Sequence, residues 1–182
     1  MNLAIIPARA GSKSIKNKNL ANLAGMPLIA YSIKTALNCK EIDKVIVSTD
    51  SEKVAAVAKK YGAEVPSIRP KSLAEDKTPM IYVLIHALKS IEKLKNLKIT
   101  NIILLDPTSP FRNNEDIINC FKTLEKPDTD SVVTVCEAEH NPYFVMRKIK
   151  NDYLVPIVKT KKTIMRRQDA PKAYRINAGV YI

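Results

Sequence analysis

Short apolar runs alternate along the chain with segments in which apolar residues recur every three or four positions. The apolar runs lie at residues 2–8, 43–49, 63–66, 100–106 and 130–138. The segments with helical periodicity lie at residues 27–39, 52–61, 84–94 and 115–124. Runs that are apolar at successive positions are typical of strands buried on both faces. Because such strands alternate with helices, we predict a three-layer α/β/α fold with a mostly parallel, Rossmann-like sheet.

Local signals mark both ends of the second predicted helix. Thr49 and Glu52 have the spacing of a capping box, which predicts that this pair starts the helix. Gly62 stands where a glycine commonly ends a helix. We therefore expect the helix to lie between these two signals.

The pattern changes after His140. Residues 142–149, 152–158 and 173–182 have the composition of strands, and no long helical segment separates them. We expect an antiparallel or mixed extension of the sheet. We interpret residues 140–175 as a candidate dimerisation segment.

Length and composition indicate one globular domain over residues 1–182. The chain has 46% hydrophobic and 26% charged residues, and no apolar run approaches the roughly 20 residues of a membrane span. Cys39, Cys120 and Cys136 are widely spaced and do not have the spacing of a zinc site. Since the N-terminus also lacks a signal-peptide pattern, we interpret them as three buried thiols of a cytoplasmic protein.

The formal net charge of +12 bears on the kind of partner. Lysine and arginine number 30 against 18 acidic residues, but aromatic residues make up only 5% and tryptophan is absent. Proteins that bind nucleic acids interleave basic residues with stacking aromatics, and no predicted helix has a continuous basic face. The charge instead peaks in short loops, which favours a small anionic substrate over a nucleic acid.

One such loop, residues 8–19, follows the first predicted strand. Its cations are Arg9, Lys13, Lys16 and Lys18. Ligands of doubly wound sheets bind beyond the carboxyl ends of the strands, where we expect this loop to meet the segment from Asp50 and the loop 106–112. Gly11 would let backbone N–H groups approach a polyphosphate, and Ser12 offers a hydroxyl. The alternative is a solvated turn that is merely rich in lysine.

Five segments of the chain, in order, carry a wider similarity. They are IPARAGSKSIKNKNL, VIVSTDSEKVAAVAKKYGAEVP, RPKSLAEDKTP, LLDPTSPFRNNEDI and RRQDAPKAYRINAGVYI. Over Leu3 to Ile182 the chain thereby resembles the acylneuraminate cytidylyltransferases. The resemblance implies a fold of the nucleotide-diphospho-sugar transferase type. It also implies transfer of CMP from CTP to the anomeric hydroxyl of a nonulosonic acid, an acidic nine-carbon sugar such as sialic or legionaminic acid, with release of pyrophosphate.

The resemblance implies nucleotide-binding roles for eight residues. They are Arg9, Ala10, Gly11, Ser12, Lys18, Asn19, Arg69 and Asp76. Arg9 and Lys18 would stabilise the charge that develops on the triphosphate, which makes them the candidate catalytic residues. Arg69 has the alternative role of tying a loop to the sheet edge. Asp76 has the alternative role of capping a helix before Thr78.

Four further residues match family segments that face the sugar. They are Asp106, Arg167, Gln168 and Asn177. An arginine suits the carboxylate of the sugar, because the two groups form a planar bidentate contact. Many family members have glutamine where this chain has Asp106. This carboxylate would therefore bind a different sugar substituent, join a metal shell or cap the PTSP loop, and it favours a legionaminate-like sugar over N-acetylneuraminate.

The resemblance also implies a metal ion and a second subunit. Mg²⁺ or Mn²⁺ would bridge the phosphates of CTP. The family's metal-binding acids lie in a DIDT-like segment that these residues do not contain. We therefore expect the main metal ligands beyond Ile182 and expect nucleotide binding to survive better than turnover. The family's homodimer implies that the segment after His140 crosses to the partner.

Three alternative functions remain at this point. A related sugar nucleotidyltransferase would use another nucleotide or sugar, which nucleotide competition would reveal. A catalytically impaired binding module would bind CTP without releasing pyrophosphate. A nucleic-acid-binding protein would show affinity for oligonucleotides that falls steeply with salt.

Overall fold

The computed structural model describes residues 1–12, 15–95, 97–161 and 163–182. The chain divides into two compact units. The first unit combines Met1–Thr134 with Ala178–Ile182, and the second unit consists of Val135–Asn177. The second unit therefore encloses the segment interpreted from the sequence as a dimerisation extension.

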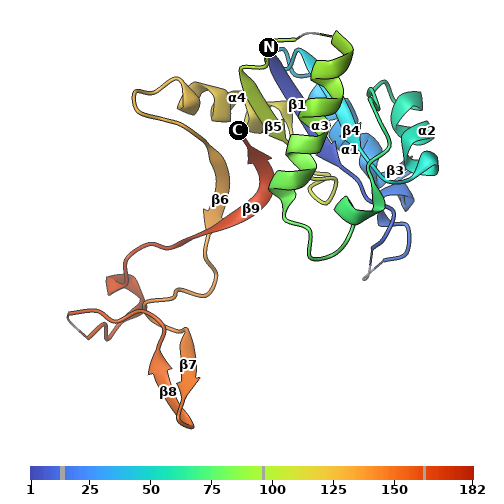
Figure 1. Cartoon of the computed structure of the whole chain (residues 1–182). Helices are drawn as coiled ribbons and strands as arrows, with labels where there is room; N and C mark the ends of the chain where they lie inside the picture. Colours follow the sequence, from blue (N-terminus) through green and yellow to red (C-terminus); the bar gives the residue numbers. More distant parts are fainter. Residues whose placement is uncertain (13–14, 96, 162) are drawn as a thin grey trace. The chain divides into compact units, whose positions relative to one another are not determined.

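A five-stranded sheet with the order β4-β1-β5-β9-β6 forms the framework (Figure 1). Strand β1 (Asn2–Pro7) pairs in parallel with β4 (Lys44–Ser48) on one side and with β5 (Asn101–Leu104) on the other. Strand β9 (Tyr174–Tyr181) runs antiparallel to β5 and separates it from β6 (Val133–Glu137). The α/β class predicted from the alternating pattern is thus confirmed, and β9 supplies the antiparallel strand.

Helices cover both faces of this sheet. They are α1 (Leu28–Leu37), α2 (Glu52–Lys60), α3 (Met80–Lys95) and α4 (Asn114–Leu124). Successive side chains of a strand point to opposite faces, so Ala4 and Ile6 of β1 pack with α1, α2 and α4, whereas Leu3 and Ile5 pack with α3. Figure 1 shows α3 in front of the sheet. None of the helices in the described ranges has the length and apolar character that a bilayer crossing requires.

Shorter elements connect this framework and build the second unit. They are the 3-10 helices η1 (Lys18–Leu20), η2 (Lys71–Leu73) and η3 (Arg167–Asp169), and the strands β2 (Asn22–Leu23), β3 (Met26–Pro27), β7 (Arg147–Lys150) and β8 (Tyr153–Pro156). Strands β7 and β8 pair with each other as an antiparallel hairpin. The hairpin is a separate two-stranded sheet, so of the three strands expected after His140 only β9 extends the main sheet.

Helix α2 begins at a cap different from the predicted one. Its N-cap is Ser51, whose Oγ accepts a hydrogen bond from Val54 N (3.4 Å). Thr49 Oγ1 accepts from Ser51 N (3.1 Å) instead of from a helical N–H. The predicted Thr49–Glu52 capping box is therefore wrong, because the residue with extended backbone directly before the helix takes that role. Gly62 has φ 97°, which confirms it as the glycine that ends the helix.

Two predicted strands are shorter than expected. Residues 63–66 contribute a single parallel bridge, between Glu64 and Ile46. Of residues 142–149 only the β7 part is extended, because Asn141 starts a turn in which its Oδ1 accepts a hydrogen bond from the backbone N–H two residues later (2.9 Å). The side-chain chemistry of one asparagine thus overrides the strand composition that follows it.

The cysteines are free, and two of the three are buried as predicted. Cys39 and Cys120 lie in the core, and burial raises the pKa of both thiols. Cys136 is only partly buried, so the prediction is wrong for this residue. It lies in β6 and belongs to neither hydrophobic core cluster.

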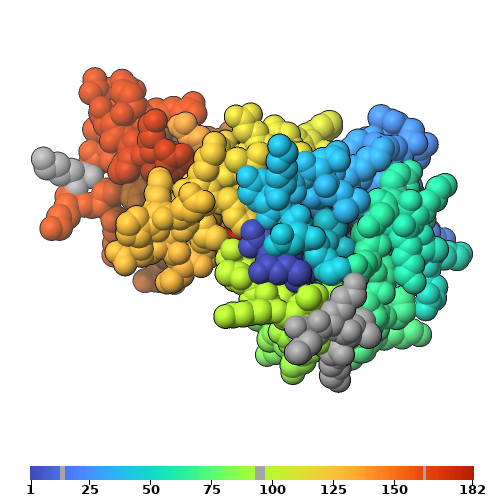
Figure 2. All heavy atoms as spheres, turned by 90° about the horizontal axis from the view of Figure 1, so that it is seen from above, coloured from blue at the N-terminus to red at the C-terminus, as the bar shows by residue number. Residues whose placement is uncertain are grey.

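Polar contacts close the amino-terminal end of the sheet. The α-amino group of Met1 donates to Thr100 Oγ1 (3.0 Å), and Asn2 N donates to Asp43 Oδ2 (2.7 Å). Figure 2 shows this end, with the dark-blue start of β1 between the light-blue segment that precedes β4 and the lime-green segment that precedes β5. The opposite, carboxyl-terminal end of the strands is where the loops with unusual chemistry gather.

Candidate functional site

A cavity of about 250 Å³ lies beyond the carboxyl ends of β1 and β5. Seven residues that the sequence singled out line it together: Arg9, Gly11, Ser12, Lys18, Asn19, Arg69 and Asp106. Four further lining residues were not predicted: Pro7, Met80, Pro107 and Thr108. Positive charge dominates this lining, since Asp106 is its one carboxylate among the described residues. A cavity with such a lining suits a small anion.

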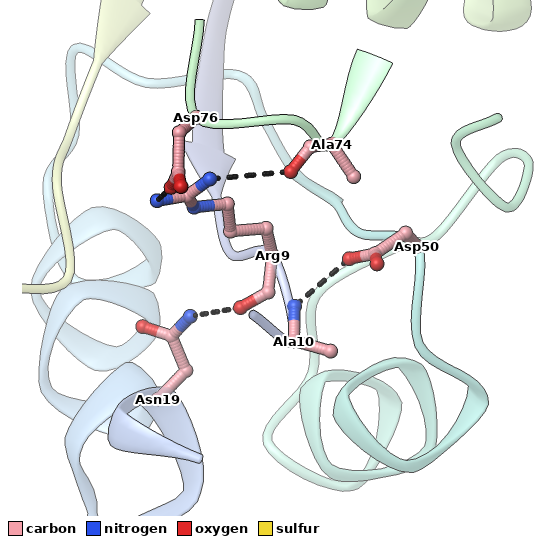
Figure 3. Close-up of polar contacts among 6 residues, drawn as sticks. All are labelled: Arg9, Ala10, Asn19, Asp50, Ala74 and Asp76. Atoms are coloured by element: carbon pink, nitrogen blue, oxygen red, sulfur yellow. Dashed lines mark hydrogen bonds and ion pairs between the residues drawn. The ribbon is translucent and has the colours of Figure 1, made fainter. Parts of the chain in front are cut away.

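Arg9 comes from the loop after β1, and its guanidinium is held by the segment that follows η2. Its NH2 lies 2.5 Å from Asp76 Oδ1, and its NH1 donates to the carbonyl of Ala74 (3.2 Å) (Figure 3). The two charged side chains are 36% and 39% exposed. Asp76 therefore pairs with an arginine of the site.

The backbone of the loop is fixed from two sides. Asn19 Nδ2 donates to the carbonyl of Arg9 (2.9 Å), and Ala10 N donates to Asp50 Oδ1 (2.8 Å) (Figure 3). Asn19 is buried in η1, which the chain enters through a left-handed residue, Asn17 (φ 52°). The N–H of Ala10 is thus already engaged. The sequence analysis pointed to the segment from Asp50, and the structure shows that this carboxylate anchors the loop.

Arg69 is the most deeply buried charge of the site. It is only 4% exposed, yet its Nε and NH2 atoms have no hydrogen-bond partner in the described part of the chain. Burial lowers the pKa of the guanidinium, with a smaller contribution from the charge of Arg9, while Asp50 opposes the shift. Buried donors without partners are costly, so this side chain is preorganised to receive an acceptor from a ligand.

Asp106 lies just after the end of β5, at the start of the PTSP loop, and is partly buried in the cavity wall. Burial raises the pKa of its carboxyl group, and the charges of Arg112 and Lys18 partly offset this shift. The backbone carbonyl of Asp106 accepts hydrogen bonds from Ser109 N (3.3 Å) and Arg112 NH2 (2.8 Å). The main chain of this residue thus closes the PTSP loop, which leaves the carboxylate to face the cavity.

Arg112 is a site-forming residue that the sequence analysis missed. It is 7% exposed, and its guanidinium donates to the carbonyls of Gly179 (2.5 Å) and Asp106 and to Ser32 Oγ (3.2 Å). Burial lowers its pKa to about 10. Arg112 therefore ties the PTSP loop to β9 and to α1 at the edge of the cavity. Its presence within a motif was the only available signal, because its burial depends on the distant strand β9.

In the described part of the chain, the cavity lining does not include two lysines of the loop after β1 or three of the four residues expected to contact the sugar. Lys13 lies outside the described residues, and Lys16 is exposed. Arg167 and Gln168 belong to η3 of the second unit and are exposed, and Asn177 ends that unit within β9. The first unit thus brings seven predicted residues to one cavity, while these three belong to the other unit.

A metal centre would need several ligand side chains close together. No group of three or more His, Cys, Asp or Glu side chains with the geometry to hold a metal ion occurs within the described residues. Mg²⁺ requires several oxygen ligands, some of which substrate phosphates and water can provide. Asp106 alone does not make such a site, so the described residues do not fit a metal centre by themselves. What they do supply to an anion is side-chain positive charge.

The fold and the cavity together are those of an α/β protein of the nucleotide-binding class. In such proteins the ligand binds beyond the carboxyl ends of the strands, where this chain has a loop rich in cations. The cytidylyltransferase family model matches residues 3–181. This chain belongs to that family and is a nucleotidyltransferase, which confirms the family resemblance inferred from the sequence motifs.

The individual relatives are similar over nearly the whole chain. CMP-N,N'-diacetyllegionaminic acid synthase of Campylobacter jejuni is 39% identical over 99% of this chain and 76% of its own length. N-acylneuraminate cytidylyltransferase of Escherichia coli is 38% identical over 83% of this chain and 34% of its own length. Among solved structures, CMP:2-keto-3-deoxy-manno-octonic acid synthetase complexed with CTP has a TM-score of 0.72 at 17% identity, covering 99% of this chain and 72% of that one. This last likeness concerns the fold.

Proposed function

We propose that this protein transfers CMP from CTP to the anomeric hydroxyl of a nonulosonic acid and releases pyrophosphate. The observation that carries the proposal is Arg69, a buried guanidinium with unpartnered donors that lines a cavity together with Arg9 and Lys18. Family membership supports the use of CTP. Relatives named for legionaminic, pseudaminic and N-acylneuraminic acids support the sugar class.

In this proposal the cations bind the triphosphate and the loop positions it. Arg9 and Lys18 would contact phosphate oxygens, and Gly11 and Ser12 would bring the loop backbone and a hydroxyl close to them. Asn19 supports Arg9 through the hydrogen bond to its carbonyl (2.9 Å). Arg69 would receive an acceptor of the nucleotide on its two free donors. The protein thereby orients CTP and neutralises its charge.

The transfer is a substitution at phosphorus. The anomeric oxygen of the sugar attacks the α-phosphorus, a new P–O bond forms, and the bond between the α-phosphorus and the bridging oxygen to the β-phosphate breaks. The hydroxyl proton leaves with solvent, and pyrophosphate carries away the electron pair of the broken bond. Reactions of this kind depend on alignment and charge stabilisation. Arg9 and Lys18 would stabilise the growing negative charge of the leaving group.

For the sugar we propose contacts with Asp106, Arg167, Gln168 and Asn177. Arg166 pairs with Asp169 through two 2.8 Å hydrogen bonds, whereas the Arg167 side chain has no polar partner within the described residues. Arg167 is thus the arginine available for the carboxylate of the sugar. Asp106 would accept hydrogen bonds from a sugar substituent, and a legionaminate-like sugar offers amide N–H donors.

We further propose a homodimer, a divalent cation and a cytoplasmic location. The second unit exposes several large apolar side chains, including Ile149, Tyr153 and Leu154, which supports a contact with a second copy. A Mg²⁺ or Mn²⁺ ion would accompany the triphosphate, with phosphate and water oxygens among its ligands. Three free cysteines agree with a reducing compartment.

The test is pyrophosphate release with CTP, Mg²⁺ and either N,N'-diacetyllegionaminate or N-acetylneuraminate. The expected result is sugar-dependent release with CTP and much less with GTP or ATP. Equal rates with all three nucleotides would contradict the cytidylyltransferase assignment. Tight CTP binding without any release would instead favour a binding module.

A further inference from the structure

The ion pair between Arg9 and Asp76 occupies a cation that the proposed reaction needs. One terminal nitrogen of Arg9 lies 2.5 Å from the Asp76 carboxylate, and the other donates to the carbonyl of Ala74 (3.2 Å). Figure 3 shows both contacts converging on the guanidinium from the same segment. In this state Arg9 is neutralised by the protein itself.

Arg9, Gly11 and Ser12 line two hollows. One is the cavity that also holds Lys18, Arg69 and Asp106. The other is a more open groove of about 640 Å³, which residues 74–77 line as well. A phosphate chain that extends from the cavity along the loop after β1 would meet Arg9 where this residue is paired with Asp76.

The two arginines that line the cavity, Arg9 and Arg69, differ in how they meet an anion. Arg69 is buried and has free donors, so an acceptor can bind it without breaking any bond. Arg9 is one-third exposed and paired, so an anion must compete with Asp76. Partly exposed ion pairs are weak, and a polyphosphate with several negative charges can therefore win this competition.

We propose that Asp76 is a displaceable counter-ion of Arg9, which the phosphates of the bound nucleotide replace. The proposal rests on the proposed function, since it takes a cytidine nucleotide as the ligand. Asp76 then does not contact the nucleotide directly. It sets a threshold of negative charge that a ligand must bring, so it discriminates triphosphate from nucleotides with fewer phosphates. It also holds the segment 74–77 against the loop while no nucleotide is bound.

The experiment is calorimetric titration of CTP, CDP, CMP and cytidine, at constant Mg²⁺ concentration, into the protein and its variants. Asp76→Asn removes the counter-ion and keeps the shape of the side chain, and Asp76→Ser is a second neutral variant. Glu75→Gln removes the same charge one residue away and is the matched control. Arg9→Ala and the double variant R9A/D76N complete a double-mutant cycle.

Three results are expected. Asp76→Asn tightens CTP binding by about two- to fivefold, in line with the strength of a partly exposed ion pair. The gain becomes smaller from CTP to CMP and is absent for cytidine, and Glu75→Gln shows a clearly smaller gain. In the Arg9→Ala background, Asp76→Asn changes nothing.

Other outcomes overturn the proposal. Weaker or unchanged CTP binding in both Asp76 variants would show that this carboxylate does not compete with the ligand. An equal gain with Glu75→Gln, or a gain that persists without Arg9, would assign the effect to general charge. If the unchanged protein bound no CTP at all, the proposed function itself would fail. The outcomes described before, with CTP still bound, would overturn only the role of Asp76.

Discussion

At the scale of single residues, the site contains two buried arginine side chains with different roles. Arg69 and Arg112 are both buried, and burial lowers the pKa of each guanidinium. They differ in their partners, because Arg112 donates to three backbone carbonyls whereas two nitrogens of Arg69 have no partner among the described atoms. Arg112 therefore serves the fold, and Arg69 is held ready for a ligand.

Replacing Arg69 with methionine should stabilise the free protein and weaken nucleotide binding. The substitution removes a buried, unpartnered charge but keeps an unbranched side chain of similar length, so we expect the melting temperature to rise by about 2–4 °C. CTP affinity should fall by at least about tenfold, as for the loss of a charge-assisted hydrogen bond. Thermal unfolding and calorimetric titration measure the two effects. A lower melting temperature together with unchanged CTP affinity would show that Arg69 has only a structural role.

His86 should make stability depend on pH. Its pKa is lowered, chiefly by burial and further by the charge of Arg69. The unfolded chain therefore takes up a proton at a higher pH than the folded chain. Stability is fully present above the ordinary histidine pKa of about 6.5 and is lost as pH falls below it. Between about pH 7.5 and pH 5, His86→Gln should lose less melting temperature than the unchanged protein. Parallel curves would contradict this role.

At the scale of elements, loops after strands build the site, and two side chains join one of these loops to strand β9. Ser109 Oγ donates to the carbonyl of Ala178 (2.9 Å), and Arg112 contacts the carbonyls of Ala178 and Gly179. The NAGVYI segment forms no turn before residue 181, since β9 continues through it. The PTSP loop is therefore held by the backbone of a strand far away in the chain.

Replacing Arg112 with methionine should destabilise the first unit. The change removes the buried hydrogen bonds from the guanidinium to the carbonyls of Asp106, Ala178 and Gly179, so we expect a loss of about 2–4 kcal/mol in the free energy of unfolding. Chemical denaturation measures this loss. Arg147→Met, at an exposed arginine of β7, is the control and should change stability by less than about 0.5 kcal/mol. Similar effects of both substitutions would show that the contacts to β9 contribute little.

Elements with local signals were predictable, and those that depend on distant partners were not. The buried strands β1, β4 and β5 are continuous apolar runs, and their order along the chain places the loops that follow at one edge of the sheet. For this reason most of the cavity lining could be predicted. The hydrogen bond from Arg112 to Gly179, the hydrogen bond from Ala10 to Asp50 and the pairing of Arg9 with Asp76 each join residues at least 40 positions apart. Periodicity carries no information about such contacts.

At the scale of the whole molecule, an apolar surface is concentrated in the second unit. Ile149 and Leu154 are directly opposed in the β7–β8 hairpin, and they are 74% and 73% exposed. Opposed residues of an antiparallel pair point to the same face, so the hairpin presents an apolar patch. Exposed patches of this kind are typical of surfaces that bind another protein.

The double variant I149K/L154E should be monomeric if the proposed homodimer uses this patch. The opposed charges keep a favourable cross-strand pair, so the hairpin itself should remain folded. Light scattering after size-exclusion chromatography measures the mass, and CTP titration should show unchanged affinity because no cavity residue is altered. Lys148→Gln, on the next residue of β7, is the control and should leave the mass as it is. A dimeric double variant would place the subunit contact elsewhere.

The strand order also determines when the sheet can be completed during synthesis. Strand β6 joins the sheet only through β9, as the order β5-β9-β6 shows. On the ribosome, β6 must therefore wait until β9 has been synthesised, although β1, β4 and β5 can already pair. Late, non-local pairing of this kind slows folding and leaves intermediates exposed. A nascent chain that stops before β9 would present an unpaired edge of β5, which makes it a natural target for chaperones.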